Sequence, residues 1–288
     1  MAGKRERKKG PRLPGALAVL AAAVVLLTSG GPRGAAAGSP AEDAVRRLPR
    51  AKEEAFIQQA PAAEPEPGEE LELEPKPEPP AAEGPTWGAV PETEAVADTY
   101  FDGAVFLGDS RTEGFSLYSG LKHGQYLYAV GATVESVFTK AAWEAEPGKK
   151  VPLLDALAGM DCERVYLMLG VNELGWTRIE NFHDQYAKVI DRIREDHPEA
   201  DIFLQSILPV SAKQEALKTY VNNKRIREYN EVIAALAEEK SCWFLNVAEA
   251  VTDDAGCLVA DWNYDGIHLN PTGCQAWLQY LRTHSVGA

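Results

Sequence analysis

Cysteine is scarce in this 288-residue sequence, and its spacing suits no metal site. The four cysteines, Cys162, Cys242, Cys257 and Cys274, form no CxxC pair, and no Cys/His spacing is typical of zinc. Outside a cell they could form one or two disulfides, with three full pairings that sequence alone does not separate. For Cys162 and Cys242, which each precede an apolar run, a buried free thiol is the simpler interpretation.

A basic stripe is also lacking from the C-terminal two thirds of the chain. Residues 96–288 contain 17 Lys or Arg and 28 Asp or Glu, a formal charge near −11. This acidity argues against a partner that is bound through phosphate groups. We therefore expect no nucleic-acid partner.

No uninterrupted apolar run reaches the roughly 20 residues of a comfortable membrane span. The longest candidate, 13–27, is apolar apart from Pro14 and Gly15, and it follows a head with six Lys or Arg. This layout is typical of a secretory signal, and 35–37 offers an A-x-A-like cleavage site. The residues after Leu27 could instead extend the run to a marginal anchor with its basic end inside. We expect 1–37 to be a signal peptide or N-terminal membrane anchor, and the protein to be extracellular or at the cell surface.

Residues 38–95 have the composition of a linker. Pro and Glu dominate, as in the run Glu-Pro-Lys-Pro-Glu-Pro-Pro at 74–80. Such a segment buries little apolar surface and does not offset its own ordering entropy. We expect a disordered but extended spacer that holds the following domain away from a bilayer, with a polyproline docking site as the alternative use.

Residues 96–288 alternate short apolar runs with stretches of helical spacing. The runs predict buried strands at Ala104–Leu107, Tyr126–Val130, Val165–Leu169, Ile202–Ile207 and Trp243–Val247. Apolar residues at intervals of three and four predict helices around 182–193, 226–236 and 271–281. This pattern predicts an α/β domain whose central parallel sheet is covered on both faces. In such sheets the functional site lies at the C-terminal ends of the strands.

Polar residues follow these strands where an acyl-transfer site would need them. Ser110 comes directly after the first strand, Gly131 after the second and Asn172 after the third, while Asp265 and His268 precede the last helix. Serine needs a base to take its proton, and His268 is the candidate, oriented by Asp265 three residues before it. The N–H groups of Ser110 and Gly131 and the side-chain amide of Asn172 could stabilise an oxyanion. A turn of Gly, Asp and Ser is the simpler interpretation of the first block alone.

Together these blocks resemble the SGNH (GDSL-type) hydrolase family. They read Gly108-Asp109-Ser110, Gly131, Gly170-Val171-Asn172 and Asp265-Gly266-Ile267-His268, in the family's order. The resemblance implies a flavodoxin-like three-layer α/β/α sandwich and a serine esterase that uses no metal or other cofactor. It also implies that Ser110 is the nucleophile, His268 the base and Asp265 its partner, with Ser110, Gly131 and Asn172 forming the oxyanion hole.

One block departs from the family pattern, because Glu173 stands where the family usually has Asp. This puts the packing of that loop in doubt more than the reaction. Arg111, Glu173, Trp176 and Trp262 lie beside the blocks, where they either line the substrate pocket or pack in the core.

The expected function is an exported serine esterase that hydrolyses O-acyl, above all O-acetyl, esters of a cell-surface or extracellular glycan. Its partner would then be an acylated carbohydrate or another small ester. A lipase or lysophospholipase, an O-acetyltransferase and a noncatalytic surface-binding domain are the alternatives. Acyl length and oligomeric state do not follow from the sequence.

Overall fold

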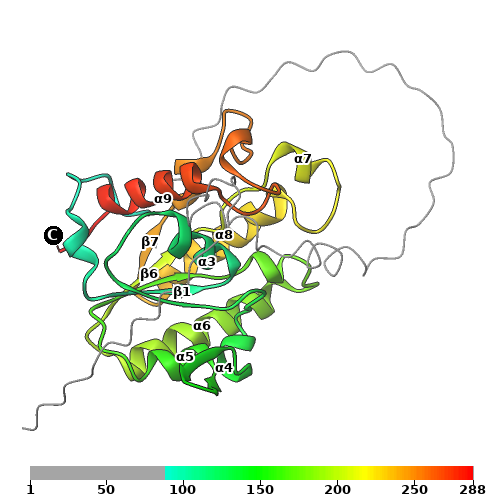
Figure 1. The fold of residues 1–288 in the computed structure, drawn as a ribbon. Helices are drawn as coiled ribbons and strands as arrows, with labels where there is room; N and C mark the ends of the chain where they lie inside the picture. Colours follow the sequence, from blue (N-terminus) through cyan, green and yellow to red (C-terminus); the bar gives the residue numbers. More distant parts are fainter. Residues whose placement is uncertain (1–87, 288) are drawn as a thin grey trace, which may run out of the picture. The chain divides into compact units, whose positions relative to one another are not determined.

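The computed structural model describes residues 88–287, and a parallel sheet forms the centre of this part (Figure 1). Its five strands have the order β2-β1-β5-β6-β7. Their bounds are β1 Ala104–Gly108, β2 Gln125–Tyr128, β5 Arg164–Met168, β6 Asp201–Gln205 and β7 Trp243–Leu245. All four neighbouring pairs are parallel, as the continuous apolar runs predict.

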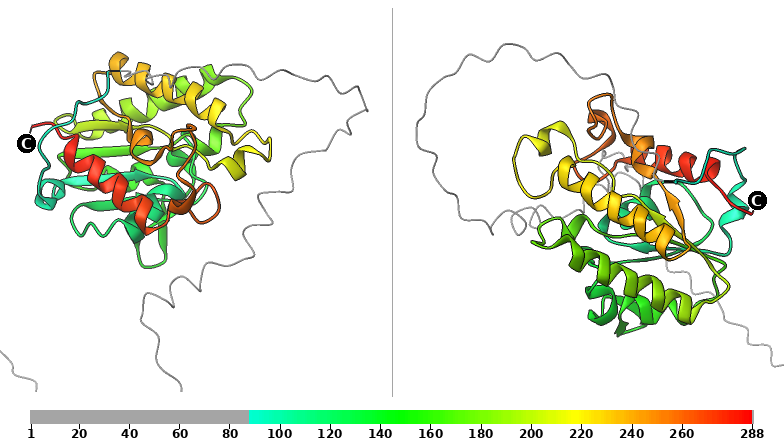
Figure 2. Two further views of the ribbon diagram at one scale, coloured as in Figure 1. Left: turned by 90° about the horizontal axis from the view of Figure 1, so that it is seen from above. Right: turned by 180° about the vertical axis from the view of Figure 1, so that it is seen from behind.

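Helices cover both faces of the sheet, which confirms the three-layer α/β/α arrangement (Figure 2). Helices α3 and α9 pack on one face, and α5, α6 and α8 pack on the other. The helix bounds are α3 Ser110–Tyr118, α4 Ser136–Thr139, α5 Leu153–Leu157, α6 Ile179–Asp196, α7 Ala212–Glu215, α8 Asn223–Glu239 and α9 Pro271–Thr283. Short 3-10 helices occur at η2 Asp98–Phe101, η3 Val171–Glu173, η4 Val247–Val251 and η5 Ala260–Trp262.

A row of stacked aromatic rings fixes the register of four strands. Phe106 on β1 is in register with Tyr126 on β2 and Tyr166 on β5, and Tyr166 is in register with Phe203 on β6. The three successive ring pairs have centroid distances of 5.1, 4.9 and 4.6 Å, close to the spacing of neighbouring strands. Such cross-strand pairs stabilise a sheet. They hold the C-terminal ends of these strands level, and the candidate site lies at this edge.

The predicted strands are all present, with small shifts at their ends. The second starts at Gln125 and ends at Tyr128 instead of Val130, and the fourth ends at Gln205 instead of Ile207. A small antiparallel hairpin, β3 Trp143–Glu146 and β4 Lys149–Val151, was not predicted. Most of its residues are exposed, so its sequence carries little apolar alternation to reveal it.

The folded part begins earlier than the predicted boundary at residue 96. Val90 is buried and its N–H donates to the carbonyl of Phe244, and Thr93 N–H donates to the carbonyl of Thr283. Residues 88–95, expected in the linker, thus pack on the domain. The predicted signal or anchor, 1–37, and the linker as far as residue 87 lie outside the described residues. Among residues 88–287, no helix has both the length and the apolar character to cross a membrane.

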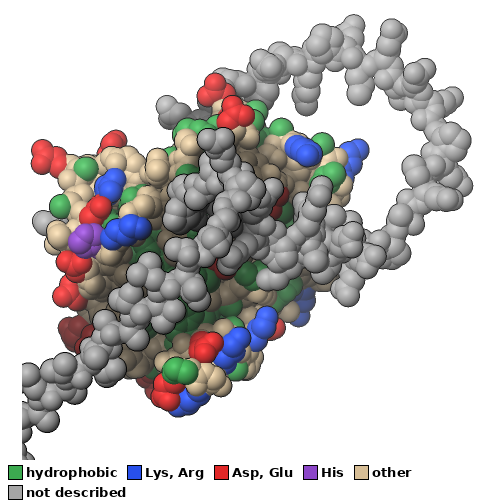
Figure 3. Space-filling view, in the orientation of Figure 1, with side chains coloured by type: hydrophobic (Ala, Val, Ile, Leu, Met, Phe, Trp, Pro, Cys, Tyr) green, Lys and Arg blue, Asp and Glu red, His purple; other side chains and the backbone are tan. Residues whose placement is uncertain are grey.

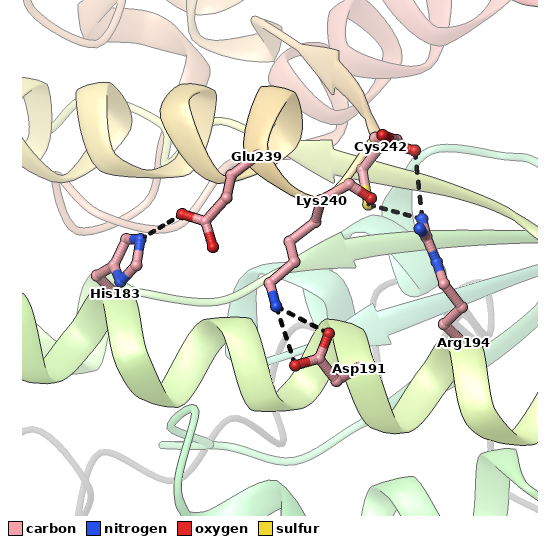
Figure 4. Close-up of polar contacts among 7 residues, drawn as sticks. His183, Asp191, Arg194, Glu239, Lys240 and Cys242 are labelled. Carbon is pink, nitrogen blue, oxygen red and sulfur yellow. Dashed lines mark hydrogen bonds and ion pairs between the residues drawn. The ribbon is translucent and has the colours of Figure 1, made fainter.

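Exposed polar contacts join α6 and α8 on the outer surface, in a set we call the α6–α8 seam (Figure 4). His183 Nε2 lies 2.9 Å from Glu239 Oε2, and Lys240 Nζ lies 2.9 Å from Asp191 Oδ1. Arg194 donates to the carbonyl of Ser241 beyond the end of α8. On the face drawn in Figure 3, acidic and basic side chains are interspersed among the described residues.

All four cysteines are free thiols in the structure. Cys274 is buried, whereas Cys162, Cys242 and Cys257 are half-buried. The interpretation of Cys162 and Cys242 as free thiols is thus confirmed, although neither is fully buried.

Candidate active site

Ser110 is the first residue of α3. Asp109, the N-cap of this helix, separates it from the end of strand β1 at Gly108. The Asp109 carboxylate caps the helix by accepting from the N–H of Arg111 at 2.8 Å. Gly108 has no room for a side chain, because a Cβ there would lie 2.2 Å from Thr112 Oγ1 and 2.4 Å from the carbonyl oxygen of Met168. The tight junction leaves the N–H of Ser110 in the first helical turn, where it has no partner within the helix and where negative charge is favoured.

The structure brings Ser110, His268 and Asp265 together in one hydrogen-bonded row. Ser110 Oγ lies 2.9 Å from His268 Nε2, and His268 Nδ1 lies 2.7 Å from Asp265 Oδ2. Ser110 and His268 are 158 residues apart in sequence, so the contact depends on the whole fold. The arrangement is that of a nucleophile, a base and an orienting carboxylate.

The turn 265–268 holds its carboxylate in a fixed position. Asp265 Oδ1 accepts from the backbone N–H groups of Ile267 and His268 at 2.9 and 2.8 Å. Burial raises the pKa of Asp265, but the hydrogen bond and charge of His268 outweigh this effect and bring it to about 2. The carboxylate is therefore charged at neutral pH, as a partner for an imidazolium must be. Gly266 in the middle of the turn has φ +91°, a conformation that favours glycine.

Gly131 and Asn172 lie on the loops that follow β2 and β5, beside the loop that carries Ser110. Ala132 N–H donates to the carbonyl of Ala129, so Gly131 is the third residue of a tight turn, and its φ of +72° is the reason for a glycine there. Asn172 Nδ2 donates to the carbonyl of Ala132 at 2.8 Å, which ties the two loops together. The amide has a second hydrogen on the same nitrogen, which remains for an oxyanion.

Glu173 forms a second tie between the same loops. Its side chain is fully buried, and Oε1 accepts from the N–H of Val134 at 2.6 Å. The hydroxyl of Tyr229 donates to the backbone carbonyl of Glu173 at 2.6 Å and fastens the loop to α8. Burial raises the pKa of Glu173 to about 8, and the Val134 N–H lowers it only in part. Glu173 thus helps to hold together the two loops that carry Gly131 and Asn172.

Of the four residues that could line the pocket or pack in the core, two belong to the core. Arg111 is 3% exposed and Glu173 0% exposed, so both lie beneath the site rather than on its surface. For these two residues the burial favours the second of the two alternatives, packing in the core. Trp176 and Trp262 are half-buried. Trp176 packs against the hydrophobic core on the α6 and α8 side of the sheet, and Trp262 against the core on the α3 and α9 side.

Sequence reasoning missed the segment Ile207–Ser211, which follows β6 and borders the site. Asn230 on α8 accepts from the N–H of Ile207 and donates to its carbonyl, and Asn223 does the same for Val210. Ser211 N–H donates to the carbonyl of Gly266, inside the turn that carries Asp265 and His268. The available signal was Asn230 inside the predicted helix around 226–236, with Asn223 seven residues, or about two helical turns, before it.

Fold and site together define an α/β protein with a serine nucleophile arrangement at the C-terminal edge of a parallel sheet. Residues 106–276 match the model of the GDSL-like Lipase/Acylhydrolase family, and the chain belongs to this family. It is therefore an enzyme of the acylhydrolase class, and the resemblance based on the four blocks is confirmed.

One solved structure agrees with this assignment of the fold. A protein from Streptococcus pneumonia, provisionally described as a platelet activating factor, is 25% identical with a TM-score of 0.53, over 62% of this chain and 81% of that one. A GDSL-like lipase from Bacteroides thetaiotaomicron is 17% identical with a TM-score of 0.46, over 64% of this chain and 89% of that one. No curated protein matches the sequence.

Proposed function

We propose that this chain is an exported serine esterase that removes O-acyl groups, above all O-acetyl groups, from a glycan at the cell surface or outside the cell. The observation that carries the proposal is the hydrogen-bonded row Ser110–His268–Asp265. Export rests on the sequence of residues 1–37.

The geometry supports a two-step acyl transfer. In the first step His268 Nε2 takes the proton of Ser110 Oγ, which attacks the ester carbonyl carbon. Asp265 stabilises the imidazolium, and the N–H groups of Ser110 and Gly131 with the amide of Asn172 stabilise the oxyanion. His268 then gives the proton to the departing alcohol oxygen. In the second step it takes a proton from water, which attacks the acyl-serine carbonyl carbon. As the bond to Ser110 Oγ breaks, His268 returns this proton to Oγ, and the carboxylic acid is released.

The openness of the site supports a bulky substrate. The side chains of His268 and Asp265 are 39% and 40% exposed. The neighbouring Tyr264 is exposed on one side, and Val130, next to Gly131, on the other. An ester carried on a polymer can reach such a surface without entering a deep pocket, and exposed aromatic rings suit a sugar face.

The exposed apolar side chains favour one second candidate, a lipase or lysophospholipase. Val130 is 47% exposed beside Gly131, where an acyl chain longer than acetyl could lie. The two candidates differ in the acyl length that they predict.

To test this difference, the full chain is given p-nitrophenyl acetate, p-nitrophenyl decanoate, O-acetylated peptidoglycan and O-acetylated xylan. Acetate release from a glycan, with little turnover of decanoate, is expected; turnover of decanoate without acetate release would overturn the glycan proposal.

The role of the triad is tested separately with a fluorophosphonate probe, which labels an activated serine. Labelling is expected in the wild type, lost in Ser110→Ala and weakened in His268→Ala. A mechanism with a histidine base also predicts that activity falls in acid. A wild type that is never labelled, or a rate that stays flat well below neutral pH, would contradict the mechanism.

A further inference from the structure

Arg111 is a buried cation directly next to the proposed nucleophile. Its side chain is 3% exposed, and Nη1 donates to the carbonyl of Leu208 at 2.9 Å. Among residues 88–287, Nε and Nη2 have no hydrogen-bond partner, and no carboxylate lies within ion-pairing distance of the guanidinium. A buried charge is costly unless it is well satisfied. An arginine with one hydrogen bond is therefore poorly explained as a source of stability.

The single hydrogen bond of Arg111 leads to the missed segment Ile207–Ser211. Leu208 lies between Ile207 and Val210, whose backbones are each held by an asparagine of α8. At the end of the segment, Ser211 N–H donates to the carbonyl of Gly266 at 2.9 Å. A Cβ on Gly266 would lie 2.6 Å from Ser211 Oγ, so Gly266 also lies close against the Ser211 side chain.

The segment thus touches the nucleophile's helix at one end and the turn of the base at the other. Gly266 is flanked by Asp265, and His268 is two residues further on. Arg111 comes directly after Ser110. A displacement of the segment would therefore move Asp265 and His268 relative to Ser110.

We propose that Arg111 is a positioning residue that sets the place of the His268–Asp265 turn relative to Ser110, through Leu208 and the backbone contact of Ser211 with Gly266. This role rests on the proposed function, since it concerns the geometry of the same triad. The side chain does not touch substrate, because it is buried beneath the site. Burial lowers the pKa of Arg111 to about 10, and the charges of Asp109 and, to a smaller extent, Asp265 partly offset this effect.

The first test compares Arg111→Met, Arg111→Lys and Arg164→Met in the full chain. Arg164 is the matched control, because it also donates to a backbone carbonyl, that of Tyr100, but at the opposite end of the sheet. With p-nitrophenyl acetate, Arg111→Met is expected to lower kcat on the order of tenfold to hundredfold with little change in KM, since small misplacements of reacting groups have effects of this size. Lysine, which keeps the charge and a donor, should restore part of the loss, and Arg164→Met should leave kcat unchanged.

A second measurement does not depend on turnover. The proton between His268 Nδ1 and Asp265 gives a downfield NMR signal, identified by its loss in His268→Ala. This signal should shift or broaden in Arg111→Met and stay in place in Arg164→Met. If the wild type shows the signal but hydrolyses no ester, the proposed function fails while the positioning role is still tested. A folded Arg111→Met with wild-type kcat and an unchanged signal would overturn the inference.

Ser211 provides a test that leaves Arg111 in place, should Arg111→Met not fold. Its φ of −65° is the value that proline imposes, so Ser211→Pro removes the N–H donated to Gly266 without straining φ. Ser211→Ala removes the same hydroxyl and keeps the N–H. A loss of kcat in the proline variant beyond that in the alanine variant supports the relay, and equal kcat values in the two would overturn it.

Discussion

Polar side chains join separate elements in two regions of this protein, and the two regions differ in burial. Beneath the catalytic edge, Asp109, Arg111 and Glu173 are each at most 3% exposed. In the α6–α8 seam, the side chains of His183 and Glu239 are 34% and 50% exposed. Water can replace a lost partner in the seam but not beneath the site. We therefore expect substitutions at the edge to change activity and stability strongly, and those in the seam to change little.

The largest contrast should come from two histidines. His268→Ala is expected to lower kcat on the order of 10⁴-fold or more, as removal of a triad base does. His183→Ala, in the seam, should leave kcat unchanged. Steady-state kinetics with p-nitrophenyl acetate, with circular dichroism to confirm folding, checks both. Similar kcat values for the two folded variants would remove the distinction between the regions.

Asn172→Ala should follow in size. It removes an oxyanion donor, for which losses of kcat on the order of 10²- to 10³-fold are typical. It also removes the bond to the carbonyl of Ala132. Fluorophosphonate labelling of Ser110 should persist, though more slowly, which separates this role from that of the base. Unchanged kcat would exclude Asn172 from the oxyanion hole.

Glu173 should show an effect on stability that depends on pH. Glu173→Ala leaves the buried N–H of Val134 without its acceptor and should destabilise the fold by about 1–3 kcal/mol. Glu173→Gln keeps an acceptor and should cost less. Because burial raises the pKa from 4.5 to about 8, the folded state favours the protonated acid. The stability of the wild type relative to Glu173→Gln should therefore be highest below pH 4.5 and decline up to about pH 8.

Urea denaturation at several pH values measures this difference. A gap between wild type and Glu173→Gln that does not change with pH would show that the carboxyl ionises equally easily in the folded and unfolded states. It would then behave like the exposed carboxylates of the seam.

The smallest effects should belong to the seam. Lys240→Met is expected to change the free energy of unfolding by about 0.5 kcal/mol or less, and less still in high salt.

Hydrogen bonds, first to Asp184 and then to Glu239, raise the pKa of His183 from 6.5. Its contribution is therefore fully present below pH 6.5 and is lost as pH rises through the higher folded pKa. Urea denaturation of Lys240→Met and His183→Gln checks both, and a loss of several kcal/mol would place the seam on a par with the edge.

Part of the candidate site could be predicted because Ser110, Gly131 and Asn172 come shortly after buried strands. The strand before Ser110 and the spacing of Asp265 and His268 can be recognised directly in the sequence. Parallel strands bring their C-terminal ends together, so residues that follow different strands are expected at one edge of the sheet. Burial is harder to read. Arginine and glutamate are residue types that usually lie on the surface, so the sequence does not reveal that Arg111 and Glu173 are buried.

The contacts of Ile207–Ser211 could not be read from the sequence for a related reason. Side chains of a helix make these contacts with backbone groups of a loop. Backbone groups do not differ between residue types, so the loop sequence does not reveal them. The hairpin 143–151 was missed because exposed strands lack a clear apolar pattern. Charge and hydropathy patterns indicate which side chains are buried in the core. The contacts of Ile207–Ser211 and the hairpin 143–151 depend instead on hydrogen bonds outside the core.

The last helix, α9, separates the candidate site from the place where the C-terminal end of the described chain lies. It begins three residues after His268 and runs for 13 residues, about 20 Å, to the place where Thr93 bonds to Thr283. Segments near both ends of the described chain lie side by side there, since Thr93 and Val96 donate to the carbonyls of Thr283 and Arg282, and the C-terminus lies beyond this end of α9 (Figures 1 and 2). An enzyme held on a support by either end would present its reacting edge outward. It would then act on material in front of it and leave the surface that carries it untouched.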